Sequence, residues 1–424
     1  MKEISYKTKK GINIYGIKNP AQHGFYISLF LRAGIMYEAA DEVGITHFLE
    51  HILIRNVNRV MNGRLYETCD RYGIEFNAST YAEMVQFYVV GARENIGIGI
   101  DIITRLFEEI MLTGQDVDAE RQRIKAEIRE SGDKTSLAAF SSAAVHSGTP
   151  LSRQITGSIG DVNRISKAML EKYRRDSFTP ENIFFYLTGG FEDKDVELLS
   201  AAVDKYELKS SAPKQNIAPV SKNAFNRECR VHIKNAAFTA LRMTFDLDMT
   251  KISLPESDLL YDTLISGYNS ELFVEMSEKR GLFYDISGSL ERYNNIGTLT
   301  FGYELRADKL YEAIEATVGI LNKIKRELTE DSCMKAGYVD NALMLYDDMR
   351  ELNFTFAYDN KILGAGYGGV RDRQNAYEKV TPERLSQVAR EVFQTKNLTL
   401  TMKGSKKKTD EGRIVGILRA LDEA

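Results

Sequence analysis

Two of the chain's five histidines lie in one short segment, THFLEHILIRN, and their spacing suits a metal site. If this segment is helical, His47 and His51 are four residues apart and project from the same face. Two imidazoles placed in this way can bind one tetrahedral zinc ion. Glu50 lies on the same side but offset, where its carboxylate can activate a water molecule without binding the metal. The alternative is a helix with two ordinary histidines beside a solvated glutamate, which chance rarely produces when histidines are so few.

A catalytic zinc site usually has three protein ligands and leaves a fourth position for water. The segment DAERQRIKAEIRES is predicted to be a helix with a charged face, and it offers three acidic candidates for the third ligand. Glu120 and Glu127 are seven residues apart and share a face, and Glu130 lies near that face. Acidic residues on an amphipathic helix are usually solvated. Spacing alone does not choose among the three.

The elements that must position these residues follow a regular order. β-branched and aromatic residues predict two neighbouring strands at 11–18 and 24–34. Apolar periodicity and Gly73 then predict, in order, a helix over about 46–57, a helix over 60–72, a hairpin over 74–92, an amphipathic helix over 94–112 and the acidic helix.

A second copy of this order begins after residue 220. The segment GLFYDISGSLERYNNIGTLTFGYEL follows the pattern of GIEFNASTYAEMVQFYVVGA almost element for element. We therefore predict an internal duplication of an α+β domain, with a zinc-binding domain at 1–207 and a homologous domain at 221–424. The expected linker, 208–220, carries two of the seven prolines. The second half lacks the paired histidines, so one zinc ion per chain is expected.

Composition excludes several other classes of protein. The 424 residues carry a net charge of -4, which argues against a generic nucleic-acid binder. Three distant cysteines, Cys69, Cys229 and Cys333, fit neither a disulfide framework nor a cysteine-rich zinc site. The first residues lack the apolar core of a signal peptide, and no stretch approaches the roughly 18 apolar residues of a membrane helix. A cytoplasmic protein without a membrane span is expected.

The segment HFLEH inverts the order of His-Glu-x-x-His and resembles the zinc motif of the M16 metallopeptidases, which include pitrilysin, insulin-degrading enzyme and mitochondrial processing peptidase. The similarity extends to LRAGIMYEAADEVGITHFLEHILIRN, to FNASTYAEMVQFYV and to EKRGLFYDISGS. It implies that His47, His51 and Glu127 bind zinc and that Glu50 is catalytic, because 75 residues separate His51 from Glu127, as in the family. Glu120 matches the family's accessory acidic residue.

The resemblance also implies a fold and a mode of substrate binding. Each of two homologous domains would hold a mostly antiparallel sheet with helices packed on one face, and together they would enclose a chamber for unfolded peptides. Asn77, Ala78 and Ser79, on an edge strand, would pair with an extended substrate. Tyr284 of Gly-Leu-x-Tyr would contact the peptide backbone. Because four such domains make the usual clamshell, the half-length chain is expected to form a dimer.

One position departs from the family pattern. Members that hold substrate with their own second domain carry an arginine seven residues before that tyrosine, where this chain has Ser277. A hydroxyl cannot replace a guanidinium fork, and Arg280 stands three residues further along. This pattern resembles heterodimeric members, such as the paired peptidases of subtilosin-type bacteriocin-maturation clusters, in which a metal-free partner supplies the Arg/Tyr pair.

The leading hypothesis is therefore a zinc endopeptidase that is the zinc-bearing subunit of a heterodimer or homodimer. A non-catalytic scaffold subunit of an M16-type complex would keep the same fold, but such subunits usually lose a histidine or the glutamate that this chain retains. A zinc hydrolase or lyase of small molecules is the other alternative. A large duplicated architecture speaks against it.

Overall fold

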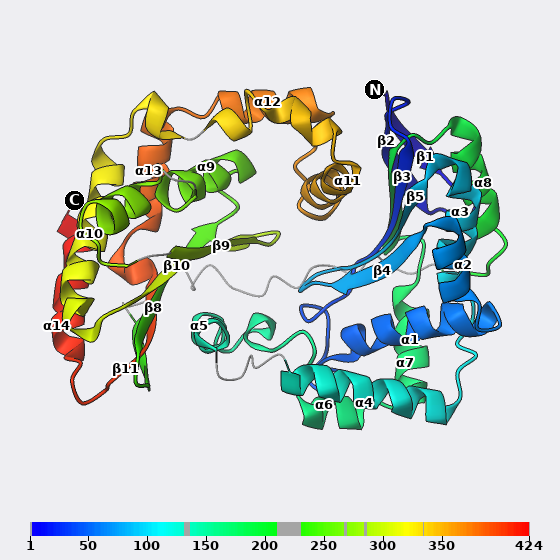
Figure 1. Ribbon diagram of the computed structural model, residues 1–424, viewed down its shortest axis with the longest axis horizontal. Coiled ribbons are helices and arrows are strands. Elements are labelled where there is room, and N and C mark those ends of the chain that lie inside the picture. Colours follow the sequence, from blue (N-terminus) through cyan, green and yellow to red (C-terminus); the bar gives the residue numbers. More distant parts are fainter. Residues whose placement is uncertain are drawn as a thin grey trace. The chain divides into compact units, whose positions relative to one another are not determined.

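The computed structural model describes residues 2–130, 136–209, 230–266, 269–283, 286–333 and 335–423. These residues form two compact units (Figure 1). Unit 1 consists of Met1–Gly132, Arg153–Ile217 and Leu343–Gly369, and unit 2 consists of Asp133–Ser152, Ala218–Ala342 and Val370–Ala424. The units therefore differ from the contiguous division at 1–207 and 221–424 by two exchanged segments. Most of the expected linker, residues 210–220, lies outside the described residues.

Unit 1 contains a six-stranded sheet in the order β1-β2-β6-β3-β5-β4. Its strands are β1 (Lys2–Lys7), β2 (Asn13–Lys18), β3 (Gly24–Leu31), β4 (Glu75–Thr80), β5 (Val85–Ala92) and β6 (Ile183–Gly189). Neighbouring strands are antiparallel, except β2 and β6, which are parallel. The two strands expected at the start of the chain form, but the prediction that they are neighbours is wrong, because β6 lies between β2 and β3.

Most helices of unit 1 cover one face of this sheet with an apolar core (Figure 1). They are α1 (Ile45–Val60), α2 (Leu65–Tyr72), α3 (Ile96–Thr104), α4 (Gly114–Glu130), α6 (Ile159–Arg164), α7 (Lys167–Ser177) and α8 (Asp193–Val203). Helix α2 begins later than expected because Asn62 and Gly63 have φ angles of 56° and 80°, which no right-handed helix accommodates. Helix α3 is likewise shorter than the predicted 94–112. None of the described helices is long and apolar enough to cross a membrane.

Unit 2 repeats the arrangement of unit 1. Its sheet has the order β7-β11-β8-β10-β9, formed by β7 (Arg230–Asn235), β8 (Thr239–Asp248), β9 (Ile286–Arg292), β10 (Ile296–Leu305) and β11 (Leu398–Gly404). As with β2 and β6, the outer pair β7 and β11 is parallel and the others are antiparallel. The order therefore matches β2-β6-β3-β5-β4 strand for strand. The predicted fold class, two homologous α+β domains with mostly antiparallel sheets, is confirmed.

The helices of unit 2 pack mainly on one face of its sheet. They are α9 (Leu254–Leu264), α10 (Leu310–Arg326), α12 (Val370–Glu378), α13 (Pro382–Val392), α14 (Glu411–Leu418) and a π-helical segment at Phe273–Glu278.

In each unit the opposite face of the sheet receives a helix from an exchanged segment. Helix α5 (Leu137–Val145) packs on β8 and β11 in unit 2, and α11 (Met349–Ala357) packs on β3 and β6 in unit 1 (Figure 1). The side chain of Asn353, on α11, is fully buried. It accepts a hydrogen bond from Ser28 Oγ at 2.8 Å and donates to the carbonyl oxygen of Tyr186 at 2.8 Å. A polar contact therefore fastens α11 to the sheet.

Replacing Asn353 with Ala is expected to lower the free energy of unfolding by about 1–3 kcal/mol, because the buried Ser28 hydroxyl and Tyr186 carbonyl lose a partner. Urea denaturation followed by circular dichroism would measure the change. Thr355→Ala is the matched control, since Thr355 lies on the same helix and bonds only to Glu351, near the surface. Equal denaturation midpoints for the two variants would contradict the anchoring role.

Candidate metal centre

Helix α1 is held at its start by a buried carboxylate. Glu38 accepts hydrogen bonds from the backbone N–H groups of Gly44, at 2.9 Å, and Thr46, at 3.0 Å, which would otherwise be unsatisfied at a helix start. Burial raises the pKa of Glu38, and these hydrogen bonds oppose the rise. Phe48 and Ile52 bury another face of the helix in the core. The helix is therefore fixed in rotation.

The structure brings His47 and His51, on α1, together with Glu127, on α4. The Nε2 atom of His47 lies 3.5 Å from Glu127 Oε1, and the Nε2 atom of His51 lies 3.6 Å from Glu127 Oε2. One ligand atom from each residue lies within 4.8 Å of the other two. A tetrahedral zinc ion with ligands at 2.0–2.1 Å needs ligand atoms roughly 3.4 Å apart, so two imidazoles and a carboxylate at these distances fit zinc.

Glu127 is the acidic candidate that joins this cluster. The hydrogen bond with His47 lowers the pKa of Glu127, although partial burial opposes the effect. An ionised carboxylate is the form that binds a metal. Within the described part of the chain, the group of side chains that could hold one metal ion contains neither Glu120 nor Glu130.

Glu50 is held from the neighbouring strand. The hydroxyl of Thr80, on β4, donates a hydrogen bond to Glu50 Oε2. Sequence reasoning missed Thr80, although it directly follows Asn77, Ala78 and Ser79 in the predicted hairpin. The structure places these three residues on β4, at the edge of the sheet.

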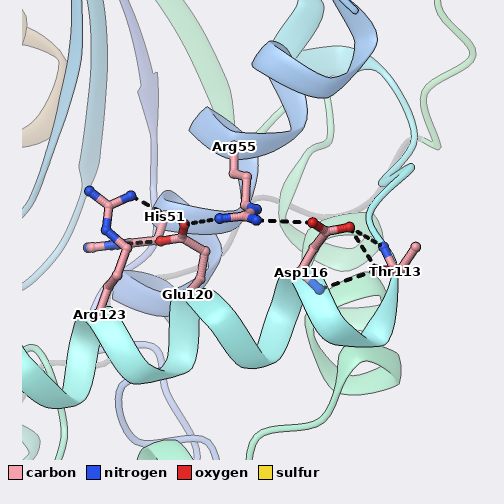
Figure 2. A network of polar contacts seen from close by, with 6 residues as sticks. All are labelled: His51, Arg55, Thr113, Asp116, Glu120 and Arg123. Carbon is pink, nitrogen blue, oxygen red and sulfur yellow. Dashed lines mark hydrogen bonds and ion pairs between the residues drawn. The ribbon is translucent and has the colours of Figure 1, made fainter. Parts of the chain in front are cut away.

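Glu120 contacts His51 (Figure 2) through Nδ1 of the ring, whereas Glu127 lies near Nε2. Its Oε2 atom lies 3.4 Å from His51 Nδ1. Arg55 bridges Glu120 and Asp116, with Nη1 donating to Glu120 Oε1 at 2.8 Å and Nη2 donating to Asp116 Oδ1 at 3.0 Å. Arg123 Nη1 donates to Glu120 Oε1 at 3.3 Å. Glu120 therefore lies behind the candidate metal ligands and contacts one of them, His51.

The charges in this network favour one tautomer of His51. Burial raises the pKa of Glu120, but hydrogen bonds with His51 and Arg55 and the charge of Arg123 outweigh burial and bring the pKa to about 2. An ionised carboxylate only accepts hydrogen bonds. We therefore assign the proton between the two groups to His51 Nδ1, which leaves Nε2, on the side of Glu127, unprotonated and able to bind a metal.

Asp116 supports the same arrangement. Thr113 donates to Asp116 Oδ2 through its backbone N–H at 2.9 Å and its hydroxyl at 2.8 Å (Figure 2). These bonds and the one from Arg55 lower the pKa of Asp116 to about 2. Sequence reasoning missed Arg55 and Asp116. Their spacing was the available signal, since each lies four residues, one helical turn, from His51 or Glu120.

Glu120→Gln is expected to weaken zinc binding by about 10- to 100-fold, the usual effect of losing an outer carboxylate partner of a metal-bound histidine. Competition with a chromophoric chelator would measure the zinc affinity. Glu130→Gln, an exposed position on the same helix, is the control. An unchanged affinity in Glu120→Gln would contradict the orienting role.

Comparison with protein families identifies the family of the chain. A family model described as Insulinase (Peptidase family M16) matches residues 14–158, and a model described as Peptidase M16 inactive domain matches residues 164–336. The two matches are consecutive and together cover most of the chain. The chain belongs to peptidase family M16. The resemblance inferred from the sequence is thereby confirmed.

Relatives of this M16 chain have similar lengths. The uncharacterized zinc protease YmxG of Bacillus subtilis is 22% identical over 393 residues, which cover 92% of this chain and 95% of the relative. An uncharacterized zinc protease of Mycobacterium tuberculosis is 22% identical over 390 residues, which cover 88% and 87%. A half-length M16 organisation is therefore shared with relatives that are named zinc proteases.

Solved structures show the same fold. A protease from Helicobacter pylori superposes with a TM-score of 0.83 at 17% identity, covering 95% of this chain and 99% of that one. The periplasmic protease PqqL of Escherichia coli gives a TM-score of 0.81 at 15% identity, covering all of this chain and 50% of PqqL. The M16 chain thus corresponds in length to one half of PqqL.

The second unit of the M16 chain lacks a free arginine at the expected substrate position. Ser277 occupies this position, within the π-helical segment Phe273–Glu278. The guanidinium of Arg280 donates to Glu275 Oε1 from Nε at 3.0 Å and from Nη2 at 2.9 Å. Tyr284 lies outside the described residues.

Proposed function

We propose that this M16 chain is a zinc-dependent endopeptidase that cleaves unfolded peptides. The observation that carries the proposal is the approach of His47, His51 and Glu127 to within 4.8 Å of one another, with Glu50 one residue before His51 on the same helix. The names of the relatives support zinc and proteolysis, and the solved structures support the fold alone.

The proposed mechanism assigns a separate task to each side chain. When bound, zinc would polarise the scissile carbonyl group and lower the pKa of the attacking water. Glu50 accepts a proton from that water and passes it to the leaving amine. Because Thr80 donates to Oε2 of Glu50, we assign the proton transfer to Oε1. Glu120 keeps the Nδ1 proton of His51 in place, with Arg55 balancing its charge.

The proposed substrate is an extended peptide chain. Asn77, Ala78 and Ser79 lie on edge strand β4, the same strand whose Thr80 contacts Glu50. An edge strand presents unpaired backbone groups, so a peptide can bind by strand addition, which recognises backbone more than sequence. Folded proteins cannot present such a strand, and this favours unfolded substrates. We assign Tyr284 a further contact with the peptide backbone.

We also propose that a homologous M16-type subunit completes the substrate site. Ser277 offers no guanidinium, and Arg280 is engaged by Glu275, so unit 2 provides no arginine at this position within its described part. A heterodimer with a metal-free partner, as in the subtilosin-type pairs, would supply the Arg/Tyr pair. A homodimer is the alternative arrangement.

Mass-spectrometric mapping of cleavage in a diverse set of unstructured peptides tests the endopeptidase function. We expect the zinc-loaded chain to cleave, a chelator to stop cleavage and added zinc to restore it. Zinc binding without any cleavage by the isolated chain would point to the missing partner, and cleavage should then appear when a homologous subunit from the same genome is added. If neither preparation cleaves peptides, the endopeptidase proposal is wrong.

A further inference from the structure

A groove in unit 1 begins at the proposed catalytic residues and continues along helix α1. It has a volume of 1440 Å³ and is lined by Glu50 and His51 at one end and by Arg59 further along the helix. Residues of α1 line it at intervals of three to four positions, so the floor of the groove is a single face of the helix. The groove is therefore continuous with the proposed active site.

Apolar side chains contribute to the lining of this groove. Tyr66, on α2, is 58% exposed, and Met111, before α4, is 62% exposed. Ile54 on the floor and Phe76 on β4 add apolar surface nearer the catalytic residues. Large apolar side chains that stay exposed in one groove favour an occupant that covers them.

The charged side chains of the groove differ in how many hydrogen bonds and ion pairs they already make within the protein. Glu120 and Asp116 each accept charged hydrogen bonds from Arg55. In contrast, the guanidinium of Arg59 is exposed, and none of the described residues bonds to it. Arg123 makes one contact with Glu120, and its side chain is 70% exposed. Unengaged donors near engaged carboxylates favour a ligand that brings its own carboxylate.

Two further charged residues line the groove, and both already have partners within the protein. Glu108 accepts a hydrogen bond from the hydroxyl of Tyr206 at 3.1 Å, and Arg105 is bound by Asp101 through Nε and Nη2. Both are therefore partly engaged within the protein. Arg59 remains the group most available to an incoming anion.

We infer that this groove binds the substrate chain on one side of the scissile bond and selects for a carboxylate at Arg59, with an apolar residue in between. The inference rests on the proposed function for the identity of the occupant. Arg59 lies eight residues beyond His51 on α1, which is about 12 Å at 1.5 Å per residue. An extended peptide covers this distance in roughly three to four residues. The preferred substrates therefore carry Asp, Glu or a free C-terminal carboxylate at that separation from the cleaved bond.

Peptide binding to the zinc-loaded Glu50→Gln variant tests the inference without turnover. Fluorescent peptides would differ only in carrying Glu or Lys at one position, scanned along an apolar sequence. At one position, we expect the peptide with Glu to bind about fivefold more tightly than the peptide with Lys, as for an exposed ion pair. Cleavage mapping with the unmutated chain should show that this position lies three to four residues from the cleaved bond. Tyr66→Ser should weaken both peptides equally.

Charge reversal at Arg59 decides the outcome. In the Glu50→Gln background, Arg59→Glu is expected to reverse the preference and Arg59→Gln to abolish it, whereas Arg175→Glu, an exposed control on α7, should preserve it. A preference that survives Arg59→Glu, or the absence of any peptide binding, would overturn the inference. The two proposals fail separately: cleavage without a dependence on Arg59 refutes the groove, and Arg59-dependent binding without cleavage, even after a homologous subunit is added, refutes the endopeptidase.

Discussion

Replacing Glu50 with Gln is expected to lower kcat/KM for peptide cleavage by about 10²- to 10⁴-fold, the usual contribution of a general base. Gln has nearly the same shape and still accepts the hydrogen bond from Thr80, but its amide cannot take a proton from water. The three metal ligands remain, so zinc content and thermal stability should not change. Kinetics on one cleaved peptide would measure kcat/KM, metal analysis would measure the zinc content, and thermal unfolding would measure the stability.

The matched control for this experiment is Glu67→Gln, an exposed glutamate on α2. It changes the same charge without touching the metal centre, so its activity should match that of the unmutated chain. Peptide cleavage that persists in Glu50→Gln would refute the assigned role of Glu50. Full zinc loading with no effect of Glu50→Gln on any activity would instead favour a non-catalytic scaffold subunit.

Glu127→Gln is expected to have the largest effect on the metal itself. Its carboxylate is the group that approaches both histidines, at 3.5 and 3.6 Å, and a neutral amide is a much weaker zinc ligand. The loss of zinc affinity should exceed the roughly 10- to 100-fold expected for an outer partner such as Glu120. Chelator competition would measure the affinity directly.

A second measurement for Glu127→Gln does not depend on activity. A ligand that binds only the folded state raises the melting temperature, so zinc should stabilise the unmutated chain and Glu130→Gln alike. The same zinc concentration should produce a much smaller shift in Glu127→Gln. An equal shift in both variants would show that Glu127 is not a ligand.

The sequence alone was sufficient for features that depend on local periodicity. A helix repeats every 3.6 residues, so the spacing of His47 and His51 by itself places both imidazoles on one face. The run of β-branched and aromatic residues likewise predicted the hairpin of β4 and β5. The repeated order of elements predicted the duplication, which the matching strand orders of the two sheets bear out.

Features that depend on contacts between distant residues required the tertiary structure. Spacing left Glu120, Glu127 and Glu130 as equal candidates, because all lie near one face of α4. The packing of α4 against α1 brings Glu127 to the Nε2 atoms of both histidines and Glu120 to the Nδ1 atom of His51. Two residues on the same face of α4 thus take different positions, which we propose are those of a metal ligand and an orienting residue, a distinction that no local pattern contains.

The same reason explains the remaining differences. The insertion of β6 between β2 and β3 joins strands more than 150 residues apart in the sequence, as the pairing of Leu29 with Phe185 illustrates. The exchange of α5 and α11 places each helix on the sheet of the other half of the chain, where polar contacts such as that of Asn353 hold α11. Apolar periodicity shows that a helix has a buried face. Only the folded chain determines which surface buries it, because that choice depends on the shape and hydrogen-bonding groups of residues far away in the sequence.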